Sequence, residues 1–85
     1  MKEFEYVIKT ECGLHARPAG LLVKEAKQFQ SAVTVSKDNA TADATKLFAV
    51  MGLGAKEKDR VRIKIDGPDE IAAASQLKNF FEKNL

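Results

Sequence analysis

The sequence predicts an α+β fold, a two-layer sandwich in which helices pack on an antiparallel sheet. Segments with alternating apolar residues, typical of half-buried strands, are interspersed with segments whose apolar residues recur at helical spacing. The expected order is strand, helix, strand, strand, helix, strand, helix. A chain of 85 residues has the length of a single domain, over residues 1–85.

The first strand is expected over residues 3–9, where Phe, Tyr and Ile alternate with charged side chains. A loop containing Gly13 follows. The next segment, Ala16–Gln28, has the apolar spacing of an amphipathic helix. Pro18 fits only the first turn of a helix, so His15 is expected at the amino end. The apolar positions of this helix are Ala19, Leu22, Val23, Ala26 and Phe29.

Two strands are expected on either side of a turn at Asp38-Asn39. Residues 33–36 alternate clearly, and Ala40–Ala44 is the weaker partner. The apolar segment Leu47–Leu53 contains one glycine and is followed by another, which predicts a short helix because glycine commonly follows the end of a helix. We expect Thr45 to be the N-cap of this helix.

The clearest alternation covers residues 60–66 and predicts a strand with Arg60 and Arg62 on its solvent side. Gly67-Pro68-Asp69-Glu70 then begins a final helix, since proline suits the first turn and acidic side chains suit the positive end of the helix dipole. The expected buried stripe of this helix comprises Ile71, Ala74, Leu77, Phe81 and Leu85.

Composition excludes several classes of function. The 14 basic and 12 acidic residues give a net charge of +2 without a Lys/Arg block, so no nucleic-acid partner is expected. The single cysteine, Cys12, excludes an internal disulfide and a cysteine cluster, and one histidine gives no metal-ligand set. The chain has no apolar signal region or membrane-spanning run, so a cytoplasmic protein without membrane insertion is expected. A chain this small has little room for a deep cofactor pocket, which favours a surface site and no cofactor.

The segment Gly13-Leu14-His15-Ala16-Arg17-Pro18 carries the candidate chemistry. The first N–H groups of a helix lack internal partners, so those of Ala16 and Arg17 could bind a phosphoryl group attached to His15. The Arg17 guanidinium could bind phosphate oxygens with two parallel hydrogen bonds. A neutral imidazole nitrogen is a good nucleophile near neutral pH and forms covalent intermediates. Taken alone, His15 is more often a capping or surface residue and Arg17 a solvated charge, but their combination at this spacing favours phosphoryl transfer.

The segment Gly13–Ala19 resembles the active-site motif of the HPr family, the histidine-containing phosphocarriers of the bacterial phosphotransferase system. The resemblance extends over the whole chain. It implies a four-stranded antiparallel sheet of order 1-4-2-3, an open-faced sandwich with three helices on one face. It also implies that enzyme I, using phosphoenolpyruvate, phosphorylates Nδ1 of His15 and that the group passes to the IIA components of sugar permeases. Such a carrier is a phosphorylated intermediate rather than an enzyme.

The resemblance further implies a partner surface on the first helix and the short helix. Its positions are Ala16, Gly20, Leu21, Leu47, Phe48 and Met51. A small apolar patch ringed by charge suits transient docking. We expect Phe48 to be exposed, while a core position for Leu47 and Met51 remains the alternative.

Three positions depart from the family pattern. Lys46 stands where many relatives have a regulatory serine, so no such serine is expected in this chain. Cys12 stands where a small polar residue is common, and Gly20 stands where alanine is usual, which loosens the first helix.

The sequence also allows functions other than that of a general sugar-transport carrier. A specialised or regulatory HPr paralogue in a dedicated phosphorelay, lacking the serine-kinase switch, is the main alternative. A module that only docks on a transcriptional regulator would not need His15, although such a regulator stays a candidate partner. An ordinary enzyme ranks last, because the sequence shows no second acid–base partner and no substrate pocket.

Overall fold

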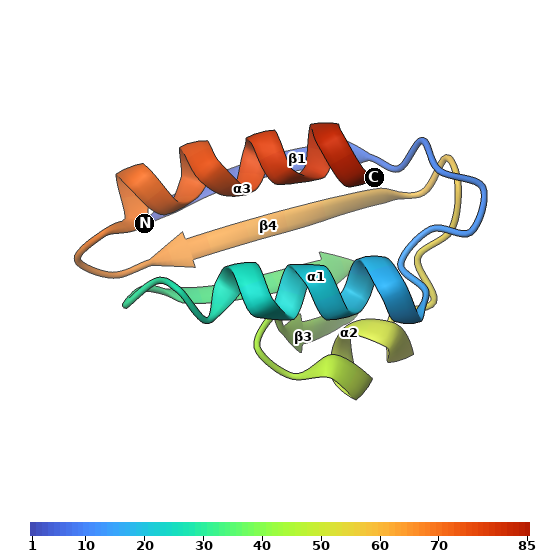
Figure 1. Cartoon of the computed structure of the whole chain (residues 1–85), viewed down its shortest axis with the longest axis horizontal. Coiled ribbons are helices and arrows are strands. Elements are labelled where there is room, and N and C mark those ends of the chain that lie inside the picture. The colour runs from blue at the N-terminus through green and yellow to red at the C-terminus, as the bar shows by residue number, and fades with distance from the viewer.

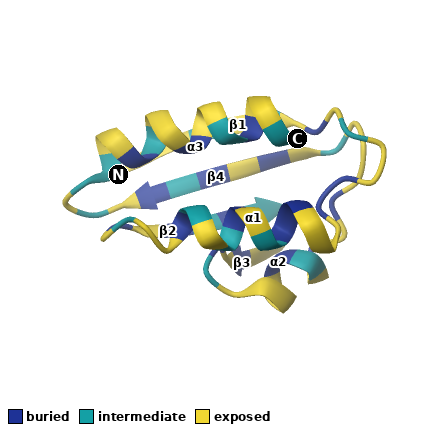
Figure 2. Cartoon of the chain, in the orientation of Figure 1, coloured by how far each residue is buried: buried dark blue, intermediate teal, exposed yellow.

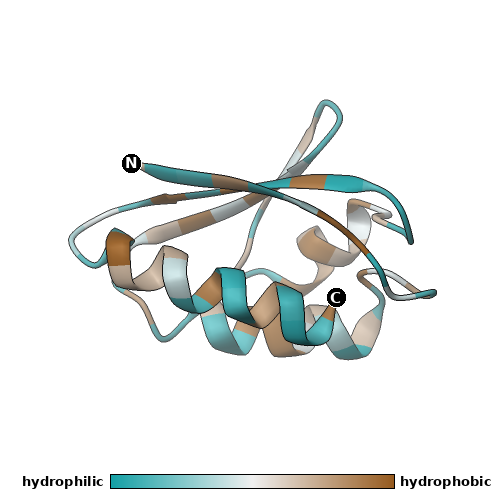
Figure 3. Ribbon diagram, turned by 90° about the horizontal axis from the view of Figure 1, so that it is seen from above, coloured by the Kyte–Doolittle hydropathy of each residue, from teal (hydrophilic) through white to brown (hydrophobic).

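The computed structural model describes all 85 residues and contains a sheet of four strands with three helices. The elements are β1 (Lys2–Val7), α1 (Ala16–Ala26), β2 (Ala32–Lys37), β3 (Ala40–Asp43), α2 (Leu47–Gly52), β4 (Arg60–Asp66) and α3 (Glu70–Asn84). All strand pairs are antiparallel in the order β1-β4-β2-β3, which confirms the expected topology. Seen from above, the sheet arches over the helices as a separate layer (Figure 3). None of the helices is long and apolar enough to cross a membrane.

Register across the sheet places apolar side chains on the face that the helices cover. Ile63 of the central strand β4 lies opposite Phe4 of β1 on one side and Val35 of β2 on the other. Burial alternates along β4 and follows one stripe of each long helix (Figure 2). The opposite face is polar, because Arg62 of β4 pairs with Glu5 of β1 at 2.8 Å. The hydrophobic core therefore lies between the sheet and the helices.

Phe81 of α3 is at the centre of the aromatic part of this core. Its side chain is completely buried. The rings of Phe4, Tyr6 and Phe80 meet it edge-on, with centroids 5.9, 5.5 and 6.0 Å away. Edge-to-face packing of this kind adds stability beyond the burial of area. Phe81 thereby joins α3 to the edge strand β1.

The expected buried stripe of α3 is wrong at its first position and only partly right at Ala74, which is half-buried. Ile71 is 72% exposed, whereas Ala73, Leu77 and Phe81 are buried. At about 100° per residue, Ile71 lies roughly 120° around the helix from Leu77, outside the face that meets the sheet. The structure thus places a small alanine, rather than the large isoleucine, against the core.

The first helix is shorter than expected and ends at Ala26 instead of Gln28. The N–H groups of Gln28 and Phe29 bond to carbonyls only three residues back, which tightens the chain into a turn. Phe29 therefore lies beyond the helix and is half-buried, as is Val23.

Thr45 does not cap α2, and that expectation is also wrong. The N-cap is Lys46, whose carbonyl accepts the first helical hydrogen bond, from Val50 at 3.0 Å. The Thr45 hydroxyl instead donates to Asp43 Oδ1 at 2.7 Å, and the Thr45 N–H donates to the same oxygen at 2.9 Å. The Thr45 hydroxyl, which an N-cap would use to bind the helix, is therefore already bonded to Asp43. At the other end, Gly54 has a φ of +64° after the helix, as expected for a glycine stop.

The loop after α1 and the loop before α3 lie at the same end of the molecule (Figure 1). Asp69 joins these two segments, which are far apart in the sequence. Its carboxylate accepts the N–H groups of Gln30 and Ser31, each at 2.9 Å, and the Ser31 hydroxyl. The hydroxyl and these N–H groups lower the pKa of Asp69. This contact ties the loop between α1 and β2 to the start of α3.

Candidate functional site

His15 is the N-cap of α1 and its imidazole is free. The backbone at His15 is extended, with φ −86° and ψ −170°, and the side chain is exposed and makes no capping hydrogen bond. The His15 carbonyl accepts the N–H of Ala19 at 2.9 Å, which starts the helix. The side chain of His15 therefore stands exposed at the amino end of α1.

The amino end of α1 offers unpaired backbone donors. The N–H groups of Ala16 and Arg17 bond to no acceptor in the chain, and Pro18, as a proline, has no N–H group. The first turn contains no acidic side chain that would neutralise the positive end of the helix. An anion attached to His15 would therefore meet uncompensated donors.

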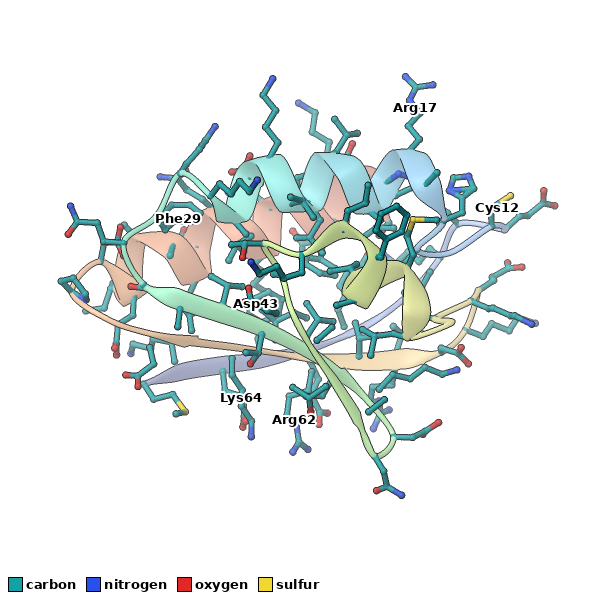
Figure 4. All side chains as sticks on the ribbon, turned by 90° about the horizontal axis from the view of Figure 1, so that it is seen from below. Cys12, Arg17, Phe29, Asp43, Arg62 and Lys64 are labelled. Carbon is teal, nitrogen blue, oxygen red and sulfur yellow. The ribbon has the colours of Figure 1, made fainter.

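Arg17 is exposed, and its side chain points away from the body of the molecule (Figure 4). Arg60 and Arg62 each have a glutamate partner on β1, whereas Arg17 forms no ion pair. The structure does not bring the Arg17 guanidinium into a hydrogen bond with His15. Its free charge and exposed position leave it able to rotate toward a phosphoryl group.

Gly13 determines the path of the backbone just before His15. It is buried and has a φ of +61°, a conformation that favours glycine. A Cβ atom at this position would lie 2.6 Å from Cα of Lys56, so any side chain would collide with the loop before β4. The next residue, Leu14, donates its N–H to the carbonyl of Ala55 at 3.0 Å. The sequence indicated a bend at Gly13 but contained no signal for this contact with residues 55–56.

The six residues of the expected partner surface, called the docking patch below, lie on two helices that pack against each other. Helix α2 lies beside the amino end of α1, which carries His15 (Figure 1). Phe48 is 83% exposed, and Leu21 and Leu47 are exposed to a smaller degree. The other members are exposed at Ala16 and half-buried at Gly20 and Met51.

The inner face of α2 is supplied by Val50, which is completely buried. Leu47 is therefore a surface residue, and Met51 packs only partly against the core. A methyl group at Gly20 would meet no atom within 4 Å, so packing does not require glycine there. Lys46 and Cys12, two departures from the family pattern, are both exposed (Cys12 is labelled in Figure 4).

Comparison with known proteins gives one consistent result. Residues 2–83 match the family model described as "PTS HPr component phosphorylation site". Phosphocarrier protein HPr of Mycoplasma genitalium is 39% identical over 85 residues, covering 99% of this chain and 97% of that protein. The structure of HPr-C-His from Thermoanaerobacter tengcongensis superposes with a TM-score of 0.93 at 38% identity, covering 99% of this chain and 94% of that one. The chain therefore belongs to the HPr family of phosphocarrier proteins of the phosphotransferase system.

Proposed function

We propose that this chain accepts a phosphoryl group on His15 from enzyme I and passes it to the IIA components of sugar permeases. The observation that carries the proposal is the exposed imidazole of His15 beside the unpaired N–H groups of Ala16 and Arg17. Family membership supports it, because relatives across the whole chain length are phosphocarriers.

The transfer step needs little beyond positioning and charge stabilisation. The lone pair of Nδ1 in neutral His15 forms a bond to phosphorus while the bond between phosphorus and the donor atom breaks, and that electron pair stays with the donor. The backbone N–H groups and the Arg17 guanidinium bind the phosphoryl oxygens. Onward transfer is the same exchange, with a IIA protein as acceptor.

The surface hollows of the molecule also favour a carrier whose site is completed by a partner. Three hollows of about 430, 360 and 400 Å³ are present, and none is lined by His15, Ala16 or Arg17. The proposed acceptor residue therefore lies outside these hollows, on the exposed surface. A partner protein that closes over it would exclude water during transfer.

Incubation with enzyme I and phosphoenolpyruvate is expected to add one phosphoryl group per chain, because the chain has one histidine. Intact mass spectrometry at high and low pH should show a group that is stable to base and labile to acid, and added IIA protein should remove it. A group stable to acid, or one that a IIA protein cannot accept, would contradict the proposal.

Phe48 is expected to anchor the docking of enzyme I. Aromatic residues at the centre of small interfaces often dominate binding, so Phe48→Ala should weaken affinity by roughly 1–3 kcal/mol. Isothermal calorimetry measures this directly. Ile71→Ala is a matched control, since Ile71 is 72% exposed on α3, outside the docking patch. Equal affinities for Phe48→Ala and the unchanged protein would show that the patch does not bind enzyme I.

The serine kinase that regulates many relatives is expected to leave this chain unmodified. Lys46 cannot form a phosphoester, and the nearest hydroxyl, on Thr45, donates to the Asp43 carboxylate at 2.7 Å. The N–H and hydroxyl of Thr45 lower the pKa of Asp43, so this carboxylate is ionised and would repel a phosphate on Thr45.

Mass spectrometry after incubation with the kinase and ATP checks this expectation. Lys46→Ser supplies a hydroxyl at the family position and should become a substrate, which shows that the kinase can recognise the fold. Efficient modification of Thr45 in the unchanged protein would prove the expectation wrong.

A further inference from the structure

We infer that Asp59 and Lys37 are positioning residues for the phosphoryl-transfer site. Their contacts, called the clamp below, hold the loop between α2 and β4 in shape. The segment just before His15 packs against that loop. The inference rests on the proposed function of His15. Neither residue touches the imidazole, and neither belongs to the docking patch. Their effect on transfer is indirect and passes through the backbone of two loops.

Two loops meet at the end of the molecule that carries His15. The loop between β1 and α1 runs beside the loop between α2 and β4 (blue and yellow in Figure 1). Three backbone hydrogen bonds join them: Leu14 N–H to Ala55 at 3.0 Å, Lys58 N–H to Ile8 at 2.8 Å, and Ile8 N–H to Asp59 at 2.9 Å. The backbone of Gly13 also packs directly on residues 55–56. The geometry just before His15 therefore depends on the shape of the loop over residues 53–59.

Asp59 and Lys37 hold that shape from both ends. Asp59 Oδ2 accepts the Lys56 N–H at 2.8 Å and pairs with Lys37 Nζ at 3.2 Å. The same ammonium donates to the carbonyl of Gly54 at 3.2 Å. One side chain from the end of β2 thus ties the first and the last part of the loop together.

This ion pair is better shielded from solvent than the pairs on the open face of the sheet. The Lys37 and Asp59 side chains are 23% and 33% exposed, whereas Arg62 and Glu5 are 49% and 43% exposed. Shielding reduces screening by salt, so the pair is more effective than a fully exposed one. The Lys56 N–H and Lys37 hold the pKa of Asp59 below its usual range, which agrees with a carboxylate that is ionised in this clamp.

The clamped loop contains a residue in an unfavourable backbone conformation. Lys58 has a φ of +74°, in the left-handed region that residues with a side chain rarely adopt. Such conformations persist only where surrounding contacts enforce them. Loss of the clamp would therefore let the loop relax and would move the Ala55 carbonyl that orients Leu14.

The kinetic test compares two aspartates with similar local roles. Asp59→Ala is expected to lower kcat for phosphorylation by enzyme I about tenfold with KM unchanged, because a small misplacement of a reacting group strongly slows transfer. Asp69→Ala is the control: Asp69 also accepts backbone N–H groups, but at the opposite end of the molecule. It should transfer at the original rate under conditions where circular dichroism shows both variants to be folded. Asp59→Asn, which can still accept the Lys56 N–H, should restore part of kcat.

Amide hydrogen exchange gives a second readout that does not require transfer. The Leu14 N–H should exchange about tenfold faster in Asp59→Ala than in the unchanged protein, and no faster in Asp69→Ala. Lys37→Met should reproduce part of both effects of Asp59→Ala, because Asp59 still accepts the Lys56 N–H in that variant. The double variant should lose less than the sum of the two single losses, because both substitutions remove the same ion pair.

The outcomes separate this inference from the proposed function. Equal kcat in Asp59→Ala and the unchanged protein, or equal slowing in Asp69→Ala, would overturn the positioning role. If the unchanged protein accepted no phosphoryl group, the proposed function would fail, while Leu14 exchange would still decide whether the clamp holds the loop. Exchange at Leu14 that is insensitive to Asp59→Ala would overturn the inference by itself.

Discussion

His15→Ala is expected to abolish phosphoryl incorporation from enzyme I and phosphoenolpyruvate. His15 is the only histidine of the chain, and the proposed function makes its imidazole, at the N-cap of α1, the nucleophile. The substitution should leave the fold intact, since the side chain is exposed and caps nothing. Exposed substitutions of this kind usually change the free energy of unfolding by less than about 0.5 kcal/mol. Intact mass and urea denaturation measure the two effects separately.

Two variants in the same segment serve as controls for the loss of incorporation. Cys12→Ser removes the other exposed soft nucleophile before α1 and should still accept one phosphoryl group. Arg17→Ala should accept the group more slowly, because it loses charge stabilisation but keeps the nucleophile. If His15→Ala still incorporated a full phosphoryl group, the acceptor would be a different residue.

The elements of the fold could be predicted because each carries a local pattern. The alternation over residues 60–66 specifies which side of β4 is buried, and the structure follows it residue by residue. Pro18 similarly fixed the start of α1, and with it the place of His15. These signals act between neighbouring residues, so one sequence contains them in full. The order of the strands came instead from the family resemblance.

The errors arose where a local rule met a competing contact. Ile71 is apolar and regularly spaced, yet its angular position on α3 turns it to solvent, and the small Ala73 is buried instead. Thr45 has the chemistry of an N-cap, but the carboxylate of Asp43 binds its hydroxyl. In both cases residue type was a weaker determinant than the geometry of the neighbouring element.

The supports of the candidate site could not be found from local patterns. Leu14 meets Ala55, and Lys37 meets Asp59, across long separations in the sequence. Such contacts follow from the sheet order and the antiparallel pairing, which place the ends of β1 and β2 beside the beginning of β4. The sequence therefore indicated the candidate acceptor residue and the backbone donors beside it, whereas the loops that support this segment became visible only in the folded chain.

Phe81→Ala is expected to destabilise the fold more than alanine at any other core position, because Phe81 is the largest completely buried side chain. Removing a completely buried phenylalanine leaves a cavity and typically costs about 3–5 kcal/mol. The rings of Phe4 and Tyr6 would lose their edge-on partner, so the contact between α3 and β1 should weaken most. Small domains have only about 5–15 kcal/mol of net stability, so the urea midpoint should fall steeply.

Phe48 provides the matched control, since it is the same residue type at 83% exposure. Phe48→Ala should leave the free energy of unfolding within about 0.5 kcal/mol of the original value, because an exposed ring leaves no cavity. Phe81→Leu removes less volume and should unfold at an intermediate urea concentration, which keeps the comparison measurable if Phe81→Ala does not fold. A Phe81→Leu midpoint equal to that of the unchanged protein, or a large loss in Phe48→Ala, would show that the two rings have been assigned to the wrong environments.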